Sequence, residues 1–569
     1  MSDGSRSTRR RMVTGLRRQP AWALIPAAFA YLLWLTTSTG QWFFADEWEF
    51  ITTRSRVSLS HFGDFVGVMM RPHNEHWSTI PIILYRAVFG VVGLRAYWPY
   101  LVVLLALHCA VAALLVRLLA RHGVDGWFAF AVAAVFLFYG AGSENILWAF
   151  QIGWMGSLAF GLVLLEILSS WSSARIRLAW VAGIAALMCS GVGISMVAAG
   201  ALTTLIRRRS WRDAARVASV PAIAQIVWFI AYGRNGGKGN PIDWSSAPYG
   251  IAGYAWRSIV STIDRTTGLI GVGAVVVVAL VVGVARQGAA FQRVHAEVIA
   301  LATASTVFLA FVGLSRIGYD YPEASRYSYV IFVMIAPLAA VLARDGLRSA
   351  GQGLRWVATG LAVVTIAFSF GGLRNDAQKE GRRERKIHQD VVAAFGLARS
   401  SFAAPDAIPD PFSGDLTMAG IRALLAQGIA PNGRATPQAV AEVTARTSVD
   451  VTVQPRVPLA PDALVIAALG RVTAQPIESG CVGFFPAGAF PQVSLLPRRP
   501  TSFKVVPLVS GTLLVTVKRD GRAAPPLQTP VAANNPVFLN LADPRNEYIV
   551  GFPPDGETKV CGIGQKLPS

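Results

Sequence analysis

The sequence predicts a polytopic α-helical membrane protein that carries a β-rich domain at its C-terminal end. Of its 569 residues, 53% are hydrophobic and only 15% are charged, and the mean hydropathy is +0.46. Such a composition is too apolar for a soluble globular protein. Long apolar runs follow one another up to residue 371, and short β-prone runs separated by turns begin near residue 448.

Residues 1–20 form a basic segment that is expected to be a cytoplasmic tail. The next run, 21–39, resembles a signal peptide but is long, and no small-residue cleavage site is followed by a soluble chain. We therefore expect a retained first span.

Within residues 21–371, the expected transmembrane domain, about eleven segments have roughly the 17–25 apolar residues that a crossing requires. These segments are 21–39, 96–120, 126–141, 152–170, 178–190, 191–206, 217–233, 267–285, 296–314, 328–343 and 355–371. The fifth and sixth are short and are separated only by Ser190 and Gly191. The apolar stretch 79–94 is expected to be an interfacial helix.

The formal net charge of +20 would suit nucleic acid or an anionic lipid surface, but its distribution favours a topology signal. Arginines cluster at 6–18, 117–121, 175–177, 207–216, 286–293 and 344–355. Each cluster precedes the first span or follows an even-numbered one, so the positive-inside rule places all of them in the cytoplasm. We therefore expect a multi-pass protein of the plasma (inner) membrane with a cytoplasmic N-terminus, an extracytoplasmic C-terminal domain and no nucleic-acid partner.

Residues 372–447 are expected to connect the two parts through helical and Pro-rich segments, and residues 448–569 to form the extracytoplasmic domain. Expected strands lie at 449–453, 463–468, 503–508, 512–518, 536–541 and 548–551. This spacing with Gly/Pro turns predicts a small β-sandwich, which could bind carbohydrate or cap the membrane domain. Cys481 and Cys561 are expected to form a disulfide, the alternative being two free buried thiols.

Four polar clusters are expected on one side of the membrane, over a large apolar body. The first contains Asp46 and Glu47, directly after three aromatic residues. Partial desolvation raises a carboxylate's pKa and improves it as a general base, so both are candidate catalytic residues. The alternative is a solvated loop with an interfacial aromatic belt.

The second cluster, residues 71–77, contains more charged and polar residues than an interfacial aromatic belt requires. Its candidate substrate-binding residues are Arg71, His73, Glu75, His76 and Trp77. The i, i+3 histidine spacing matches no standard zinc signature, so no metal site is assigned. A divalent cation such as Mg or Mn, held by an acid together with a phosphate, stays open as a cofactor.

The third and fourth clusters follow later in the chain. In the third cluster the candidates are Glu144, Asn145 and Gln151, and on a helix Glu144, Trp148 and Gln151 would lie roughly on one face. A carboxylate and an amide near the membrane boundary are costly unless they are functional or paired, for example with an arginine. In the fourth cluster tyrosines can stack on sugars and arginines can bind phosphate. Its candidates are Arg316, Tyr319, Arg326 and Tyr327. Snorkelling of Arg326 without a substrate is the alternative.

The chain resembles the GT-C superfamily of integral-membrane glycosyltransferases. The resemblance rests on the acidic pair Asp46-Glu47 in the first exoplasmic loop, the many-span body, the later Ser325-Arg326-Tyr327 and the soluble C-terminal domain. It implies a GT-C-like fold, and transfer of a sugar from a polyprenyl-phosphate donor to a glycan or lipid acceptor at the outer face. The arginine bias and the external domain are similar to actinobacterial cell-wall enzymes. Many members of the superfamily carry Asp-Asp, or a spaced acidic pair, in this loop, whereas this chain carries Asp46-Glu47. The resemblance therefore leaves open which of the two acids takes part in the reaction.

The implied mechanism has Asp46 deprotonate an acceptor hydroxyl that attacks the anomeric carbon with inversion. Three other classes stay open. A polysaccharide polymerase or O-antigen ligase would use a lipid-diphosphate donor. A transporter would need acids inside its spans, and Glu166 is the candidate for that role. A non-catalytic assembly protein would tolerate Asp46→Asn.

Overall fold

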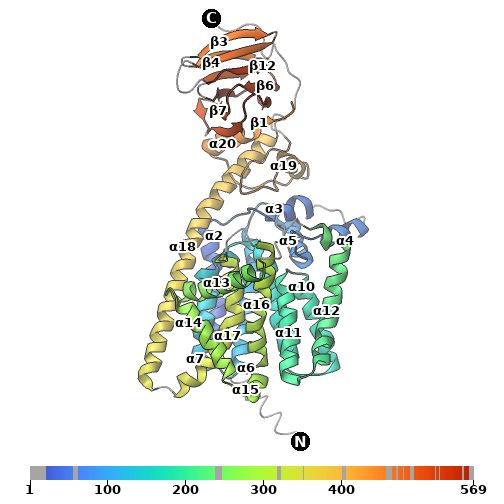
Figure 1. The fold of residues 1–569 in the computed structure, drawn as a ribbon, viewed down its shortest axis with the longest axis vertical. Helices are drawn as coiled ribbons and strands as arrows, with labels where there is room; N and C mark the ends of the chain where they lie inside the picture. Colours follow the sequence, from blue (N-terminus) through green and yellow to red (C-terminus); the bar gives the residue numbers. More distant parts are fainter. Residues whose placement is uncertain are drawn as a thin grey trace. The chain divides into compact units, whose positions relative to one another are not determined.

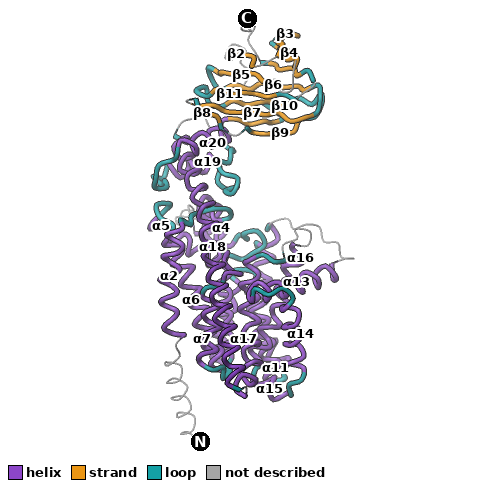
Figure 2. Tube along the Cα trace, turned by 90° about the vertical axis from the view of Figure 1, so that its left-hand side faces the viewer, coloured by secondary structure: helices purple, strands orange, loops and turns teal. Residues whose placement is uncertain are grey.

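The computed structural model is mostly helical and ends in a β-rich domain (Figures 1 and 2). The residues it describes are 21–54, 62–236, 247–316, 322–349, 351–399, 405–455, 464–469, 472–478, 480–486, 492–519, 521–524, 526–553 and 556–562. The chain forms two compact units. The first contains residues 1–41, 57–88 and 97–382, and the second contains residues 42–56, 89–96 and 383–569. Two helices, α5 and α18, each run from one unit into the other.

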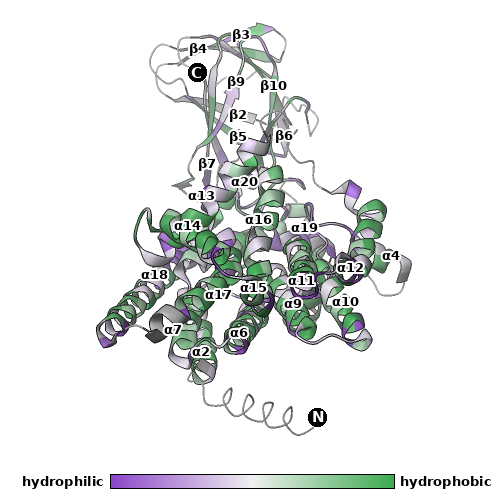
Figure 3. Ribbon diagram, turned by 60° about the horizontal axis from the view of Figure 1, so that its bottom comes forward, coloured by the Kyte–Doolittle hydropathy of each residue, from purple (hydrophilic) through white to green (hydrophobic). Residues whose placement is uncertain are grey.

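The first unit is built from apolar helices, which Figure 3 colours mainly as hydrophobic. In chain order, the helices lying wholly or partly in this unit are α2 (Ala21–Thr39), α4 (Phe62–Met70), α5 (Thr79–Val92), α6 (Trp98–Arg121), α7 (Gly126–Leu137), η2 (Gly140–Gly142), α8 (Ser143–Leu147), η3 (Ala149–Gln151), α9 (Ile152–Leu168), α10 (Ser173–Leu187), α11 (Val192–Arg208), α12 (Trp211–Ala231), η4 (Gly233–Asn235), α13 (Ala247–Thr267), α14 (Val272–Ala285), α15 (Ala289–Val294), α16 (Ala296–Arg316), α17 (Ser325–Ser349) and α18 (Gln352–Ala398).

Among the described residues, seven helices are long and apolar enough to cross a membrane, or up to nine if each of two bent helix pairs is one span. The protein is therefore membrane-embedded. Every segment expected to cross coincides with a helix, and the expected interfacial stretch is α5. However, α10 and α11 contain only 15 and 17 residues. A crossing needs about 20 residues, so length alone does not make these two helices spans.

Helices α13 and α14 form one of the bent pairs, with an angle of 113° between them. Gly271, with a φ of 88°, occupies the cap position before α14. The Asp264 carboxylate accepts hydrogen bonds from the backbone N–H groups of Gly271 at 2.9 Å and Gly273 at 2.6 Å. It thereby satisfies N–H groups that the start of α14 leaves without intrahelical partners. Helix α13 was not expected from the sequence, because its polar residues interrupt the apolar run.

Helix α11 is central to the packing, since α9, α10, α12 and α16 all lie against it. Small residues permit these close approaches. A Cβ atom added to Gly156 of α9 would lie 2.8 Å from the Sγ atom of Cys189, and one added to Gly183 of α10 would lie 3.0 Å from Pro221 of α12. Ser157 of α9 donates a hydrogen bond to the carbonyl of Ala186 at 2.7 Å. Membrane helices associate through small residues and polar contacts of this kind.

The second unit contains the loop helices α3 (Glu47–Glu49) and η1 (Phe50–Arg54), followed much later by α19 (Met418–Leu425) and α20 (Pro437–Ser448). Its strands are β1 (Val449–Thr452), β2 (Leu464–Leu469), β3 (Val472–Glu478), β4 (Cys481–Pro486), β5 (Gln492–Pro497), β6 (Thr501–Pro507), β7 (Gly511–Arg519), β8 (Arg522–Ala523), β9 (Leu527–Val531), β10 (Val537–Leu541), β11 (Glu547–Gly551) and β12 (Thr558–Cys561).

Within the described residues these strands form two six-stranded antiparallel sheets that share one core. The first sheet has the order β1-β10-β6-β12-β4-β3, and the second has the order β2-β5-β11-β7-β8 with β9 paired to β7. Inward side chains alternate along each strand, as in Phe503 and Val505 of β6 or Val515 and Val517 of β7. Ala445 of α20 joins the same core. This is the arrangement of a β-sandwich.

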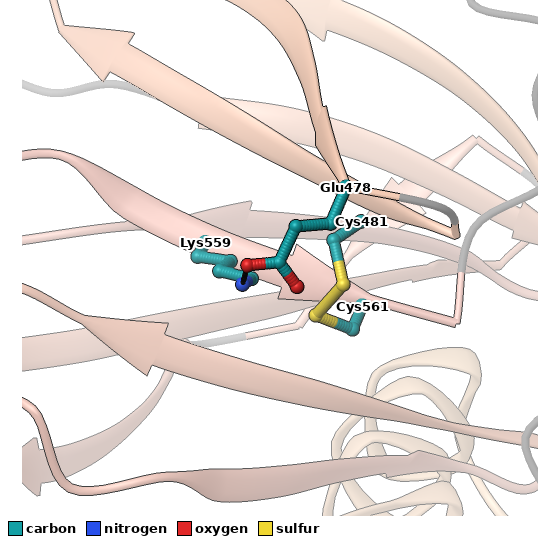
Figure 4. Close-up of a disulfide and its surroundings, with 4 residues drawn as sticks. All are labelled: Glu478, Cys481, Lys559 and Cys561. Carbon is teal, nitrogen blue, oxygen red and sulfur yellow. Dashed lines mark ion pairs between the residues drawn. A yellow bond between two sulfur atoms is a disulfide. The ribbon is translucent and has the colours of Figure 1, made fainter.

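Cys481 and Cys561, the pair expected from the sequence, form a disulfide (Figure 4). They are directly opposite each other on the neighbouring strands β4 and β12. Beside them Lys559 forms an ion pair with Glu478 of β3. The covalent bond closes the chain between residues 80 positions apart.

Candidate functional site

A two-residue hairpin presents the second polar cluster of the first loop. The backbones of His73 and His76 exchange hydrogen bonds of 3.0 and 2.9 Å, and Asn74 between them has a φ of 51°. Asparagine tolerates this left-handed conformation better than most residues. His73 is buried with its ring 5.1 Å from that of Phe150, whereas Glu75 at the hairpin tip is exposed.

Trp77 anchors the hairpin to the helices. Its ring stacks on that of Trp228 from α12, with centroids 5.4 Å apart and an interplanar angle of 5°. The Trp77 indole N–H donates to the Thr79 hydroxyl at 2.9 Å, and the Trp228 indole N–H donates to the carbonyl of Met70 at 2.8 Å. Both indole groups are thus satisfied although buried, which fixes the position of the loop.

The third cluster lies where the helical chain is interrupted between α7 and α9. Helix α8 ends at Leu147, and Trp148 is extended before η3 begins. The expectation that Glu144, Trp148 and Gln151 share one helix face is therefore wrong, because no continuous helix connects them. Breaks of this kind bring backbone and polar groups together at membrane depth only where protein or a cavity surrounds them.

Glu144 binds Arg326, which brings the third and fourth clusters together. The Arg326 Nη1 atom lies 3.0 Å from Oε1 of Glu144. Ser325 accepts a hydrogen bond from the Glu144 backbone N–H at 3.2 Å. Ser143 donates to a carboxylate oxygen of Asp376, from α18, at 2.6 Å. The pairing of Glu144 with an arginine, stated above as the structural alternative, is what the structure contains.

Five predicted residues line one cavity of about 500 Å³ within the first unit. They are Glu75, His76, Trp77, Arg326 and Tyr327. The rest of the lining is mainly apolar, from the end of α10, the start of α11, α9, α12 and α16. Among these residues the ring of Trp154 stacks on that of Tyr327, with centroids 5.9 Å apart. The polar groups therefore share a cavity with a much larger apolar surface.

Helices α12 and α16 contribute large apolar side chains to the cavity. Both helices pack on α11, which contributes Val192 and Ile194 to the cavity. Phe229 of α12 and Phe311 of α16 line it while remaining 52% and 51% exposed. The cavity therefore has large, half-exposed apolar side chains in its lining as well as polar groups from the first loop.

Asn145 and Gln151 are buried but are not among the residues that line this cavity. Within the described part of the chain, neither amide atom of Asn145 has a hydrogen-bond partner, and neither has the Gln151 carbonyl oxygen. Arg71 is exposed. Arg316 is the last residue of α16, and its side chain lies outside the described residues, as does the whole of Tyr319.

Asp46 and Glu47 belong to the second unit. Asp46 precedes α3 and is partly exposed. Glu47 is fully buried, and its carboxylate accepts a hydrogen bond from the Phe44 backbone N–H at 3.0 Å. A buried carboxylate committed to the backbone stabilises the loop, so of the two acids Asp46 is the better candidate for chemistry.

Among the described residues, no group of three or more His, Cys, Asp or Glu side chains could hold a metal ion.

Glu166, the acid on which a transporter interpretation depends, lies near the C-terminal end of α9. It forms ion pairs with Arg117 at 2.8 Å and Arg121 at 3.4 Å. It is therefore neutralised near a helix end and is not an isolated charge at mid-span.

Three residues of the site were not predicted from the sequence: Asp376, Trp154 and Gln225. Asp376 lies in the charged segment after the last apolar run, two residues after Arg374, and this charged segment was the available signal. Trp154 and Gln225 both line the cavity, but single aromatic or amide residues inside apolar runs carry no distinguishing pattern. No family model matches this sequence, and neither does any curated protein.

Proposed function

We propose that this protein is a GT-C-like membrane glycosyltransferase that moves a sugar from a polyprenyl-phosphate donor to a cell-envelope glycan or lipid acceptor. The observation that supports it most is the cavity itself. Its first-loop residues Glu75 and His76 and its α17 residues Arg326 and Tyr327 share a lining that is otherwise apolar. An anionic headgroup on a long hydrocarbon chain is the ligand class that suits both parts.

Each part of the cavity has a role in this proposal. The prenyl chain enters between Phe229 and Phe311 and occupies the apolar part. Arg326 binds the phosphate, since a guanidinium has five N–H donors and more than one remains beside the bond to Glu144. His76 donates a further hydrogen bond, and the stacked rings of Trp154 and Tyr327 offer an aromatic surface to the sugar.

In the reaction, an acceptor hydroxyl oxygen forms a bond to the anomeric carbon as the bond from that carbon to the phosphate oxygen breaks. The configuration inverts, and the lipid phosphate leaves with the electron pair. The hydroxyl proton goes to a carboxylate, for which Asp46 is the candidate taken from the sequence. Because phosphate is a good leaving group, a second carboxylic acid is not required.

The proposal includes a location. All eleven apolar segments would cross the plasma membrane, α10 and α11 included, with the arginine-rich helix ends in the cytoplasm and the β-sandwich outside. In this orientation the cavity opens near the outer face, where prenyl-phosphate sugars meet envelope acceptors.

The test is transfer of radiolabelled sugar from a panel of prenyl-phosphate donors by the purified full-length protein. Arg326→Gln is expected to raise the donor KM at least tenfold, since a hydrogen bond to a charged group contributes roughly 1.5–3 kcal/mol. Asp46→Asn is expected to lower kcat at least a hundredfold. Arg234→Gln, an exposed arginine outside the cavity lining, is the matched control.

Each other outcome has a definite meaning. Full activity of Asp46→Asn would move the base to another acid, with Glu75 first. Full activity of Arg326→Gln would show that this cavity does not bind the donor in the reaction. A protein that uses only lipid-diphosphate donors would be a polymerase or ligase, and one that transfers no sugar would not be a glycosyltransferase.

A further inference from the structure

A second cavity, of about 310 Å³, lies at the opposite end of α11. Thr203, Thr204, Arg207 and Arg208 of α11 line it, together with Trp171 and Ser169 from the connection between α9 and α10. The first cavity contacts α11 near Val192, so at 1.5 Å per residue the two cavities are about 20 Å apart along the helix. The second cavity is therefore a separate place in the first unit, with no role in the proposed sugar transfer.

Positive charge predominates around this second cavity. Each nearby carboxylate is shared between two arginines. Glu166 contacts Arg117 and Arg121, Glu297 contacts Arg121 and Arg207, and Asp213 contacts Arg208 and Arg216. These five arginines and three carboxylates leave an excess of two positive charges. A ligand at this place is expected to be an anion.

The polar groups of the cavity are fixed in position. The Arg208 guanidinium lies over the Trp171 ring at 4.4 Å from its centroid, and its Nε atom donates to Asp213 at 2.7 Å. Arg207 donates through Nη1 to the carbonyl of Leu168 at 3.1 Å, and its Nη2 atom forms an ion pair with Glu297 at 3.2 Å. A guanidinium fixed by stacking and ion pairing loses little entropy when its remaining donors bind an anion.

One buried hydroxyl of this cavity lacks a partner. Thr203 is 1% exposed, and no described residue forms a hydrogen bond with its Oγ1 atom. Its neighbour Thr204 is satisfied, since it donates to the carbonyl of Gly200 at 3.0 Å. Buried polar groups usually have a partner, so Thr203 adds an unused hydroxyl donor to the lining of this arginine-lined cavity.

The cavity also lies at the depth of a membrane surface. Leu168 ends α9, Arg208 ends α11, and α10 and α12 begin beside them. Trp211, at the first position of α12, is 70% exposed, and Leu205 of α11 is 40% exposed. Exposed tryptophan at the ends of apolar helices marks the interface between hydrocarbon and water, where lipid phosphates reside.

We propose that this second cavity binds the phosphate of an anionic phospholipid headgroup. Arg207 and Arg208 donate to the phosphate oxygens, and the Thr203 hydroxyl donates a further hydrogen bond. The acyl chains lie along the apolar outer surface of α11 and α10, next to Leu205. Basic pockets between membrane helices are a known means of recognising phospholipid headgroups.

A phospholipid headgroup and free inorganic phosphate both carry a phosphate group, so the experiment is designed to distinguish these two ligands. Binding to the purified full-length protein in detergent is measured by native mass spectrometry with dioleoyl phosphatidic acid, dioleoyl phosphatidylcholine and inorganic phosphate as probes. Phosphatidic acid is expected to bind at least tenfold more tightly than phosphatidylcholine, and inorganic phosphate is expected not to displace it at a hundredfold excess.

Three variants locate the binding. Arg208→Gln is expected to weaken phosphatidic acid binding about tenfold, since it removes a charged donor. Thr203→Val, which keeps the shape of the side chain, is expected to weaken it severalfold. Arg212→Gln, at the start of α12, loses the same charge only four residues after Arg208 without lining the cavity, and a change below about twofold is expected.

The proposal is overturned if Arg208→Gln and Arg212→Gln weaken binding equally, because the lipid would then sense only surface charge. It is also overturned if inorganic phosphate displaces the lipid, or if Arg208→Gln and Thr203→Val both bind like wild type. Arg208 is exposed and Thr203→Val is isosteric, so the variants are expected to fold, which their thermal unfolding verifies. Sugar transfer is measured separately, and its failure would leave this test unaffected.

Discussion

Arg326 is held by Glu144, and this pair determines how the cavity presents its charge. The Glu144 carboxylate lies 3.0 Å from one guanidinium nitrogen of Arg326, and the Ser325 hydroxyl accepts a hydrogen bond from the Glu144 backbone N–H. Glu144 therefore acts through Arg326 as a positioning residue in the proposed reaction. An ion pair that is partly buried retains more of its attraction than one in water.

Glu144→Gln is expected to raise the donor KM about fivefold to tenfold while kcat changes less than twofold. The substitution keeps the size of the side chain but leaves Arg326 less firmly oriented, which affects binding of the donor phosphate. Initial rates over a range of donor concentrations measure both constants. Glu323→Gln, at an exposed acid near the start of α17, is the control, and an equal effect there would contradict the positioning role.

Asp543 gives the β-sandwich a dependence on pH. Burial by itself raises the pKa of this carboxyl, but hydrogen bonds from the side chain and backbone of Arg545, with the charges of Arg545 and Arg519, hold its pKa below the ordinary value. The Arg545 Nη2 and Arg519 Nη1 atoms lie 2.7 and 3.2 Å from Oδ2 of Asp543. A carboxyl with a lower pKa in the folded state stabilises that state only while it is ionised.

The stabilisation from Asp543 is therefore fully present above its unfolded pKa of about 4 and is lost as the pH falls through the lower folded pKa. We expect the unfolding temperature of the sandwich to decrease below about pH 4, and Asp543→Asn to flatten that decrease. The unfolding temperature is measured at a series of pH values by thermal unfolding, monitored by far-UV circular dichroism. An identical pH profile for Asp543→Asn would show that another carboxyl is responsible.

At the scale of elements, apolar length and composition predicted the membrane helices, because a run of about 20 apolar residues has few alternatives in a bilayer. The same criterion missed α13, in which Arg257, Asp264 and Arg265 interrupt the apolar pattern. Among the described residues, strands β3, β4, β5, β8, β9 and β12 were not expected from the sequence. In the first three, Pro476, Gly483 and prolines at the strand ends resemble turn signals. Tertiary hydrogen bonding overrides those local preferences.

Helix α18 offers a test of how closely its neighbour α2 approaches. A Cβ atom added to Gly381 would collide with the backbone carbonyl of Thr39, at the end of α2, whereas one added to Gly371 would meet open space. Gly381→Ala is expected to cost about 1–3 kcal/mol, since backbone cannot move aside cheaply. Gly371→Ala is expected to gain about 0.5–1 kcal/mol from helix propensity. The unfolding temperatures of both variants are measured in the same detergent. Equal shifts in the two variants would contradict the close contact between Gly381 and Thr39.

At the scale of the whole molecule, the chain combines a membrane-embedded helical unit with a unit that contains a disulfide-linked sandwich. The residue types of the first cavity and their place in the chain could be predicted, because polar groups beside apolar spans stand out. What could not be predicted is which groups pair. The bonds from Arg326 to Glu144 and from Ser143 to Asp376 depend on the packing of helices far apart in sequence.

Removing the disulfide is expected to destabilise the sandwich. Because the bond closes a chain of 80 residues, loss of its constraint on the unfolded state corresponds to about 4 kcal/mol. The double variant Cys481→Ser/Cys561→Ser is expected to unfold at a lower temperature and denaturant concentration than the wild type. A reductant is expected to shift the wild type toward the double variant and to leave the double variant unchanged. Equal stability of both proteins would contradict this expectation.

The hairpin of the first loop has a consequence for recognising relatives of this protein in genomes. Because His73 and His76 exchange both backbone hydrogen bonds, an insertion or deletion between them would turn the Glu75 side chain away from the cavity. Natural relatives are thus expected to vary in residue type at Asn74, where Gly or Asp also suits the turn, but not in the number of residues. We therefore expect relatives to keep a fixed-length pattern of two histidines, with an acid directly before the second and a tryptophan directly after it.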